Sequence, residues 1–194
     1  MEITSAQLKE LRDKTGISVM QCKKALEEAG GDMEKALIIL QKKGGEAASK
    51  KSDRELGSGT IGSYVHNTGE VAALVNLACE TDFVAKNEEF IKLARDIAMH
   101  VAAQAPLYVT REDVDETALT KAREVFKVEV ADKPADMQEK ILEGKLSAYF
   151  KDRILLEQPF IKDSEKTISD LINNAVQKFG ENIAIAEVRR VSVK

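Results

Sequence analysis

The sequence predicts an α+β fold, with a helical N-terminal module followed by a core built on an antiparallel sheet with flanking helices. Strand-like segments flank a short turn within residues 60–80, and another such segment closes the chain at 183–193. Helical periodicity fills the first 43 residues and most of the interval between the strands. Strands and helices that are segregated in this way are typical of α+β rather than of alternating α/β proteins.

Three short helices are expected within residues 1–43. The residues that begin or end them are Gly16, Ser18, Gln21, Gly30, Gly31, Asp32, Gly44 and Gly45. Ser18 forms a capping box with Gln21, and Asp32 caps the third helix. Gly44-Gly45 is expected to end that helix, because glycine is typical of helix C-termini. A module of this size has a small core, which favours a docking role over a deep binding pocket.

A linker is predicted after the module. Residues 44–58 are rich in Gly, Ser, Ala and charged residues and poor in large apolar side chains. The predicted domains are therefore a three-helix module at residues 1–43, a linker at 44–58, and an α+β core at 59–194. The core is also expected to carry a surface for dimerisation.

The core is expected to begin with a β-hairpin. Residues 60–66 and 71–80 flank the turn Asn67-Thr68-Gly69 and contain many β-branched or aromatic residues. The second of these strands is nearly all apolar, which predicts a central strand with both faces covered.

Helices are expected between the hairpin and the last strand. The first has an apolar stripe from Phe90 to Val101. Two more, at about 116–130 and 136–156, are separated by Pro134 and should pack as antiparallel neighbours. Thr167 with Asp170 caps a final helix, which ends at Gly180.

The composition excludes several classes of protein. The 194 residues include 29 basic and 33 acidic side chains, a formal net charge of −4. No basic excess is present to follow a phosphate backbone, so direct nucleic-acid binding is not expected. No apolar run reaches the roughly 18 residues of a membrane span, and no signal-peptide core follows Met1. A cytoplasmic protein without membrane contact is expected.

The residues that could carry chemistry make a poor set for a covalent catalyst. His66, Cys79, Glu80 and Asp82 lie nearest to a strand end, but Cys79 falls on the inward row of its strand and is interpreted as a small buried hydrophobe. The sequence has no phosphate-binding loop or nucleophile elbow, and neither histidine has a second metal ligand at the usual spacing. No enzyme, cofactor or metal is therefore expected, and a thiol hydrolase using Cys79 and His66 is kept as an alternative.

Phe83 is the unusual residue of this region, because a large aromatic side chain stands beside Asp82 where the chain leaves a strand. A phenylalanine after a strand is more often a core residue than a ligand contact, since its burial gains about 1.5–3 kcal/mol. Thr81 and Asp82, however, are typical of loops and helix caps. If the turn points outward, Phe83 is suited to enter a crevice on a partner.

Several segments resemble the translation elongation factor Ts family. Residues 11–26, LRDKTGISVMQCKKAL, resemble its N-terminal signature, and residues 77–86, LACETDFVAK, resemble its core signature. Segments 62–66, 97–103 and 158–163 also fit in the same order, so the resemblance covers nearly the whole chain.

The resemblance implies a guanine-nucleotide exchange factor for elongation factor Tu, the GTPase that delivers aminoacyl-tRNA to the ribosome. It implies that the N-terminal module is ubiquitin-associated-like (UBA-like). In the family, a Thr-Asp-Phe-Val loop enters the GTPase beside its magnesium site, and the matching residues here are Thr81, Asp82, Phe83 and Val84. Secondary partner contacts are expected at Leu11, Arg12, His66 and Asn67.

The resemblance also raises the question of assembly. Longer family members carry two related core subdomains, whereas this chain has material for one. A homodimer is therefore expected, and the last strand, 183–193, is a candidate for the pairing edge because it carries apolar residues on both faces. A different class of function, a ubiquitin-like or peptide-binding adaptor that uses residues 1–43, is kept as an alternative.

Overall fold

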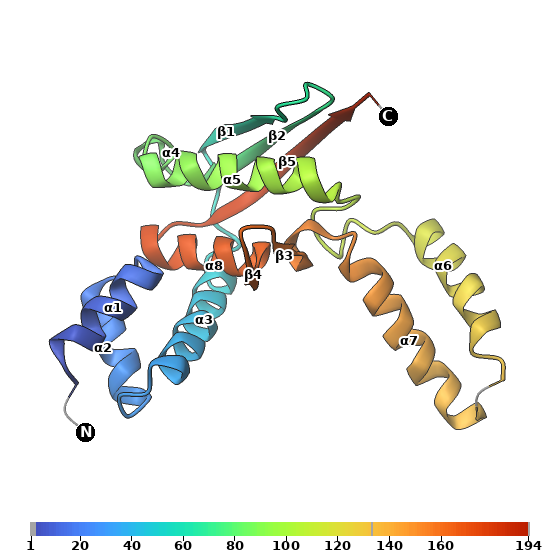
Figure 1. Ribbon diagram of the computed structural model, residues 1–194, viewed down its shortest axis with the longest axis horizontal. Helices are drawn as coiled ribbons and strands as arrows, with labels where there is room; N and C mark the ends of the chain where they lie inside the picture. The colour runs from blue at the N-terminus through green and yellow to red at the C-terminus, as the bar shows by residue number, and fades with distance from the viewer. Residues whose placement is uncertain (1–2, 133, 194) are drawn as a thin grey trace.

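The computed structural model describes residues 3–132 and 134–193, so the predicted domain ends at residues 1 and 194 lie outside the described residues. Figure 1 shows a sheet with helices beneath it, the N-terminal helices on one side and a long helical hairpin on the other. The mixed helix and antiparallel-sheet architecture confirms the α+β prediction. None of the helices in the described ranges is long and apolar enough to cross a membrane.

The N-terminal module consists of α1 (Ser5–Thr15), α2 (Val19–Glu28) and α3 (Met33–Ser49). The Ser18 side chain caps α2 by accepting from the Gln21 backbone N–H, and Asp32 caps α3 in the same way. The reciprocal half of the Ser18 capping box is replaced by a contact with the core, in which Gln177 Nε2 donates to Gln21 Oε1 over 2.7 Å. The fully buried residues of the module are Leu11, Cys22, Ala25, Leu26 and Ala36.

The expected end of α3 at Gly44-Gly45 is wrong, because the helix continues to Ser49. The glycine serves a close helix contact instead. A Cβ on Gly44 would lie 3.3 Å from the carbonyl oxygen of Asn173 and from Gln177 Oε1, both on α8 (Ile168–Phe179). The packing against α8 offsets the roughly 1 kcal/mol by which glycine weakens a helix interior.

The first six residues of the predicted linker are therefore helical and packed on the core. Asn174 of α8 also donates a hydrogen bond to the Thr15 carbonyl. The division at 1–43, 44–58 and 59–194 remains a prediction, although α3 extends into the first part of the predicted linker and packs on the core.

The main sheet has the strand order β1-β2-β5, with every neighbour antiparallel. Its strands are β1 (Ser58–Val65), β2 (Val71–Cys79) and β5 (Ile183–Ser192). The central position predicted for β2 is confirmed. The register places Ser58 opposite Cys79 at one end of the sheet and Val65 opposite Ala72 at the other.

The prediction that both faces of β2 are covered is wrong. Ala73, Val75 and Leu77 are buried beneath α5 (Glu88–Gln104), whereas Leu74 on the opposite face is exposed. The physical reason is the layering, because α5 and α8 both lie on one side of the sheet (Figure 1). Helix α5 crosses so close to β1 that a Cβ on Gly62 would overlap the backbone of Ala94.

The hairpin of α6 (Glu116–Glu129) and α7 (Ala135–Lys151) projects away from the sheet and its helices (Figure 1). The helix expected to reach residue 156 ends at Lys151, and a short turn, η1 (Leu155–Glu157), follows. The chain leaves the helix after Lys151 because tertiary contacts hold the residues that follow. Ile154 and Leu155 are fully buried, and the Leu155 N–H donates to the Tyr108 carbonyl over 2.8 Å.

A second, two-stranded sheet of β3 (Pro159–Phe160) and β4 (Asp163–Thr167) follows this turn and was not predicted. The expected capping box of Thr167 and Asp170 is present at the start of α8, and Gly180 ends that helix with a φ of +76°.

His100 of α5 ties this region to the core. Its Nε2 lies 2.9 Å from Gln158 Oε1, and its Nδ1 accepts from the Ile161 N–H. Gln158 in turn donates its amide to the Asp152 carbonyl at the root of α7. Because Nδ1 accepts a hydrogen bond, it carries no proton, so His100 is neutral with its proton on Nε2, facing Gln158 Oε1. Burial lowers the pKa of His100.

Candidate functional site

A single helical turn, α4 (Asp82–Ala85), follows β2 and separates two kinds of side chain. Val84 and Ala85 are buried in the main core, whereas Phe83 is 81% exposed. Phe83 is therefore not a core residue, and the turn points it outward. Leaving a phenylalanine in water forgoes about 1.5–3 kcal/mol of burial, which makes this exposure a feature to be explained.

Asp82 lies beside Phe83 and is also exposed. Lys86 Nζ is 2.7 Å from Asp82 Oδ2. The hydrogen bond from Lys86, together with its charge, holds the pKa of Asp82 below its ordinary value of 3.8, so the carboxylate is ionised at neutral pH. We call Thr81, Asp82, Phe83 and Val84 the wedge turn. Its surface offers one aromatic ring next to one negative charge.

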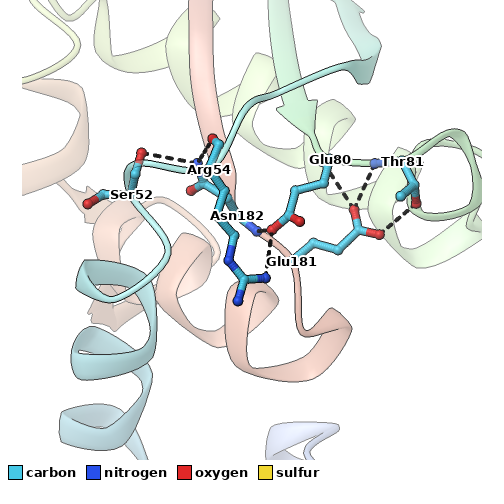
Figure 2. Close-up of polar contacts among 6 residues, drawn as sticks. All are labelled: Ser52, Arg54, Glu80, Thr81, Glu181 and Asn182. Atoms are coloured by element: carbon cyan, nitrogen blue, oxygen red, sulfur yellow. Dashed lines mark hydrogen bonds and ion pairs between the residues drawn. The ribbon is translucent and has the colours of Figure 1, made fainter.

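The base of the wedge turn is held by Glu181, from the connection between α8 and β5 (Figure 2). Glu181 Oε2 accepts from the backbone N–H of Glu80 over 3.1 Å and from that of Thr81 over 3.0 Å. Glu181 Oε1 accepts from the Thr81 hydroxyl over 2.6 Å. The same hydroxyl oxygen accepts from the Val84 N–H and so caps α4.

Glu80 and Asn182 extend this arrangement, as Figure 2 shows. Glu80 Oε1 accepts from the Asn182 backbone N–H and from Arg54 Nη1. The first of these hydrogen bonds, then that from Arg54, lowers the pKa of Glu80. Asn182 Nδ2 donates to the carbonyls of Ser52 and Arg54. We call Ser52, Arg54, Glu80, Thr81, Glu181 and Asn182 the polar network.

Glu181 and Asn182 are not among the site residues that the sequence predicts. They lie about 100 residues from Thr81 along the chain, and the local sequence signals only that a helix ends at Gly180. Periodicity and capping rules describe neighbours in sequence, so they carry no information on this contact.

The four residues expected to make secondary partner contacts differ in their exposure to solvent. Arg12, His66 and Asn67 are exposed, whereas Leu11 is fully buried in the module core. The prediction of a partner contact at Leu11 is wrong for this conformation, because the side chain has no surface to offer. Val19 and Met20 are the exposed apolar side chains at the start of α2.

His66 and Asn67 lie at the hairpin turn, far from the wedge turn. The register of β1 and β2 puts that turn at one end of β2 and Thr81 beyond the other end. A strand of this length spans about 26 Å at roughly 3.3 Å per residue. The two groups therefore form separate surfaces on one chain.

The alternative of a thiol hydrolase is not supported. His66 interacts with Tyr64, whereas Cys79 is buried at the opposite end of β2 with its thiol 3.2 Å from the Thr81 carbonyl. Burial raises the pKa of the Cys79 thiol, and the negative charge of Glu181 raises it further. The thiol is therefore protonated, and His66 is not placed to act as its base. In residues 3–132 and 134–193, no group of three or more His, Cys, Asp or Glu residues is placed to hold a metal ion.

Comparisons with known proteins agree with the resemblance in the sequence. The family model described as "Elongation factor TS" matches residues 3–194. The chain is 50% identical over 194 residues to Elongation factor Ts of Thermodesulfovibrio yellowstonii, with 100% of this chain and 97% of the relative covered. It is 48% identical over 193 residues to Elongation factor Ts of Thermosipho melanesiensis, with 98% of each covered. The corresponding protein of Thermotoga petrophila is also 48% identical over 193 residues, covering 100% of this chain and 97% of the relative.

Proposed function

The chain belongs to the elongation factor Ts family and is thus a translation elongation factor; we propose that it promotes GDP release from elongation factor Tu. The observation that carries this proposal is the wedge turn, in which an 81% exposed aromatic ring stands beside an ionised carboxylate on a fixed backbone. Large aromatic side chains of this kind are the usual anchors of protein interfaces.

The proposed mechanism uses binding and no covalent step. Phe83 enters a crevice of the GTPase next to its magnesium site, and Asp82 presents a negative charge to the groups that hold the ion. The magnesium ion would be displaced from its site in the GTPase. The phosphates of GDP would then lose the cation that shields their negative charge. The protein itself acts without a cofactor, in the cytoplasm, and is not an enzyme in the bond-making sense.

Thermodynamic linkage gives this proposal its test. If the exchange factor weakens the hold of the GTPase on GDP, then GDP weakens the hold of the GTPase on the exchange factor by the same factor. A stopped-flow trace of fluorescent GDP leaving elongation factor Tu should accelerate when the protein is added, and added GDP should dissociate the complex. An unchanged trace would contradict the proposal and favour the adaptor alternative based on residues 1–43.

We also propose that the working form is a homodimer, joined through the open face of the sheet. The large exposed apolar side chains on this face are Ile61, Val65, Leu74 and Val191. Val65 and Val191 lie on either side of Ala72 in the register, so an apolar row crosses all three strands. A second copy offers the matching surface about a two-fold axis. This arrangement uses the sheet face, in addition to the edge strand β5 expected from the sequence.

The dimer is tested by light scattering at micromolar concentration. Val191→Arg should produce monomers, because an unpaired charge would be buried at the interface. Val128→Arg on α6 is the matched control, since Val128 is similarly exposed but lies off the sheet. A wild-type protein that is monomeric and fully active would refute the dimer.

A further inference from the structure

We infer that Glu181 is the positioning residue of the wedge turn, and that Asn182 links this turn to the chain that leaves the N-terminal module. The inference rests on the proposed exchange function and assigns the groups that hold the contact surface in place. Neither residue touches a nucleotide or a metal, so both act through Thr81 and the turn that it caps.

The first step concerns the helix itself. Helix α4 has four residues, from Asp82 to Ala85. Helical segments this short have no stability of their own, because nucleation of a turn is unfavourable. The direction of Phe83 therefore depends on contacts outside α4. Burial of Val84 and Ala85 supplies one side of this support.

Glu181 supplies the other side. Strand β2 ends at Cys79, so the backbone N–H groups of Glu80 and Thr81 lie beyond the last strand pair. Both donate to one oxygen of the Glu181 carboxylate, and the Thr81 hydroxyl donates to the other. A carboxylate is suited to this role because both of its oxygens accept hydrogen bonds. By accepting the hydrogen bond of the Thr81 hydroxyl, Glu181 orients the hydroxyl so that its oxygen can accept from the Val84 N–H.

Asn182 joins three segments that are distant in sequence. Its side chain is buried, with 7% of its surface exposed, and its amide donates to the carbonyls of Ser52 and Arg54. Its backbone N–H donates to Glu80, which also accepts from Arg54. Because α3 runs without interruption to Ser49, residues 52–54 belong to the short connection between the module and β1, and Asn182 holds this connection beside the start of the wedge turn.

The consequence is a fixed relation between two proposed contact surfaces, the module and the wedge turn. Ordering a flexible surface on binding costs free energy, whereas a preorganised surface avoids most of that cost. Loss of Glu181 should therefore reduce the ability of the bound protein to insert Phe83, while docking through the other surfaces persists.

The experiment compares three variants of the full chain in the release of fluorescent GDP from elongation factor Tu. Glu181→Ala removes all three acceptor contacts. Glu181→Gln keeps one carboxamide oxygen for the two N–H groups, while its amide can donate to the Thr81 hydroxyl. Glu139→Ala is the matched control, because Glu139 is an exposed residue of α7 that pairs with Arg123 on the projecting hairpin, away from the wedge turn and from the sheet face.

The expected result is a graded loss. Glu181→Ala should lower the maximal release rate about tenfold, because the bound protein must order the wedge turn before Phe83 can insert. The half-saturating concentration of the protein should change by less than about threefold, because docking through the other surfaces persists. Glu181→Gln should recover most of the rate, and Glu139→Ala should match the wild type. A Glu181→Ala protein with the wild-type maximal rate would overturn the inference.

A second measurement needs no variant and no partner. In the free wild-type protein, the backbone amides of Glu80 and Thr81 should exchange with deuterium as slowly as those of β2, because Glu181 holds them. Exchange at the rate of an unstructured chain would overturn the inference even if Glu181→Ala failed to fold. A wild-type protein with protected amides but no effect on GDP release would instead refute the proposed function and leave the positioning geometry intact.

Discussion

The wedge turn and the α6–α7 hairpin both present large apolar side chains to solvent, but the rest of the molecule supports them differently. Phe83 is 81% exposed and Val128 is 77% exposed. The backbone beneath Phe83 is held by three hydrogen bonds to Glu181 and by the burial of Val84. Val128 lies in a hairpin that joins the molecule only at its root (Figure 1).

The difference shows that exposure by itself does not mark a functional side chain. The two hairpin helices are joined by exposed ion pairs, Arg123 with Glu139 and Lys145 with Glu129, which contribute little in water. The backbone beneath Phe83 is held by segments far apart in the sequence, whereas Val128 lies on a hairpin whose two helices pack mainly on each other and on the residues at its root. A surface that is already held in place avoids an ordering cost on binding.

The largest expected effect separates the two side chains by function. Phe83→Ala should lower the rate of GDP release by about thirtyfold, equivalent to about 2 kcal/mol, because it removes the aromatic anchor. Val128→Ala should leave the rate unchanged. Circular dichroism and melting should show both variants folded, since neither side chain is buried. Unfolding of Phe83→Ala would show that the ring has a core role instead.

A pH titration examines the root of the hairpin. Burial holds the pKa of His100 below its ordinary value of 6.5. As the pH falls below about 6.5, the unfolded state binds a proton that the folded state does not, so the free energy of unfolding decreases by at most about 1.4 kcal/mol per pH unit until the lower folded pKa is passed. Urea unfolding between pH 7.5 and 5 should show this slope. His100→Gln should flatten the slope, because the glutamine side chain does not titrate.

Two glycines test how closely the helices are packed. At Gly144 in α7, no atom of another described element lies within 4 Å of the position that a Cβ would occupy, so Gly144→Ala should stabilise the helix by about 0.5–1 kcal/mol. Gly44→Ala should gain less or lose stability, because its Cβ would lie 3.3 Å from a backbone carbonyl of α8. Differential scanning calorimetry of the two variants measures the contrast. Equal stabilisation would show that α3 and α8 can separate freely.

The smallest effect is expected at the ion pairs of the hairpin. Lys145→Met removes the contact with Glu129 and should cost about 0.5 kcal/mol or less, because both side chains are largely exposed. Raising the salt concentration to about 1 M should erase most of the difference between variant and wild type. A cost above about 1 kcal/mol, persisting in salt, would mean that the hairpin is more firmly held than its contacts indicate.

The helices and the main strands could be predicted from the sequence because their apolar spacing and caps are local signals. Thr167 with Asp170 and the stripe from Phe90 to Val101 are examples, and both are present in the structure. The end of α3 could not be predicted, because Gly44 is a local signal for termination that packing against α8 overrides. The open face of β2 was also missed, since Leu74 is apolar whether or not a layer covers it.

The site was predictable only in part. Thr81 and Asp82 next to Phe83 indicated a loop that carries an aromatic residue, but the sequence alone did not decide between a buried and an exposed ring. The exposure follows from Val84 and Ala85 occupying the core side of α4. The support from Glu181 and Asn182 is a contact between segments about 100 residues apart, which no local rule describes.

The separation of about 100 residues between β2 and β5 sets the order in which the site is completed during synthesis of the chain. Glu181, Asn182 and β5 are made about 100 residues after Thr81, so β2 leaves the ribosome with one neighbour and an unsupported wedge turn. At roughly 5–20 residues per second, this interval lasts on the order of 5–20 s. Throughout that time, the nascent chain lacks the carboxylate that holds the backbone beneath Phe83. The wedge turn gains this support only after Glu181 has been made.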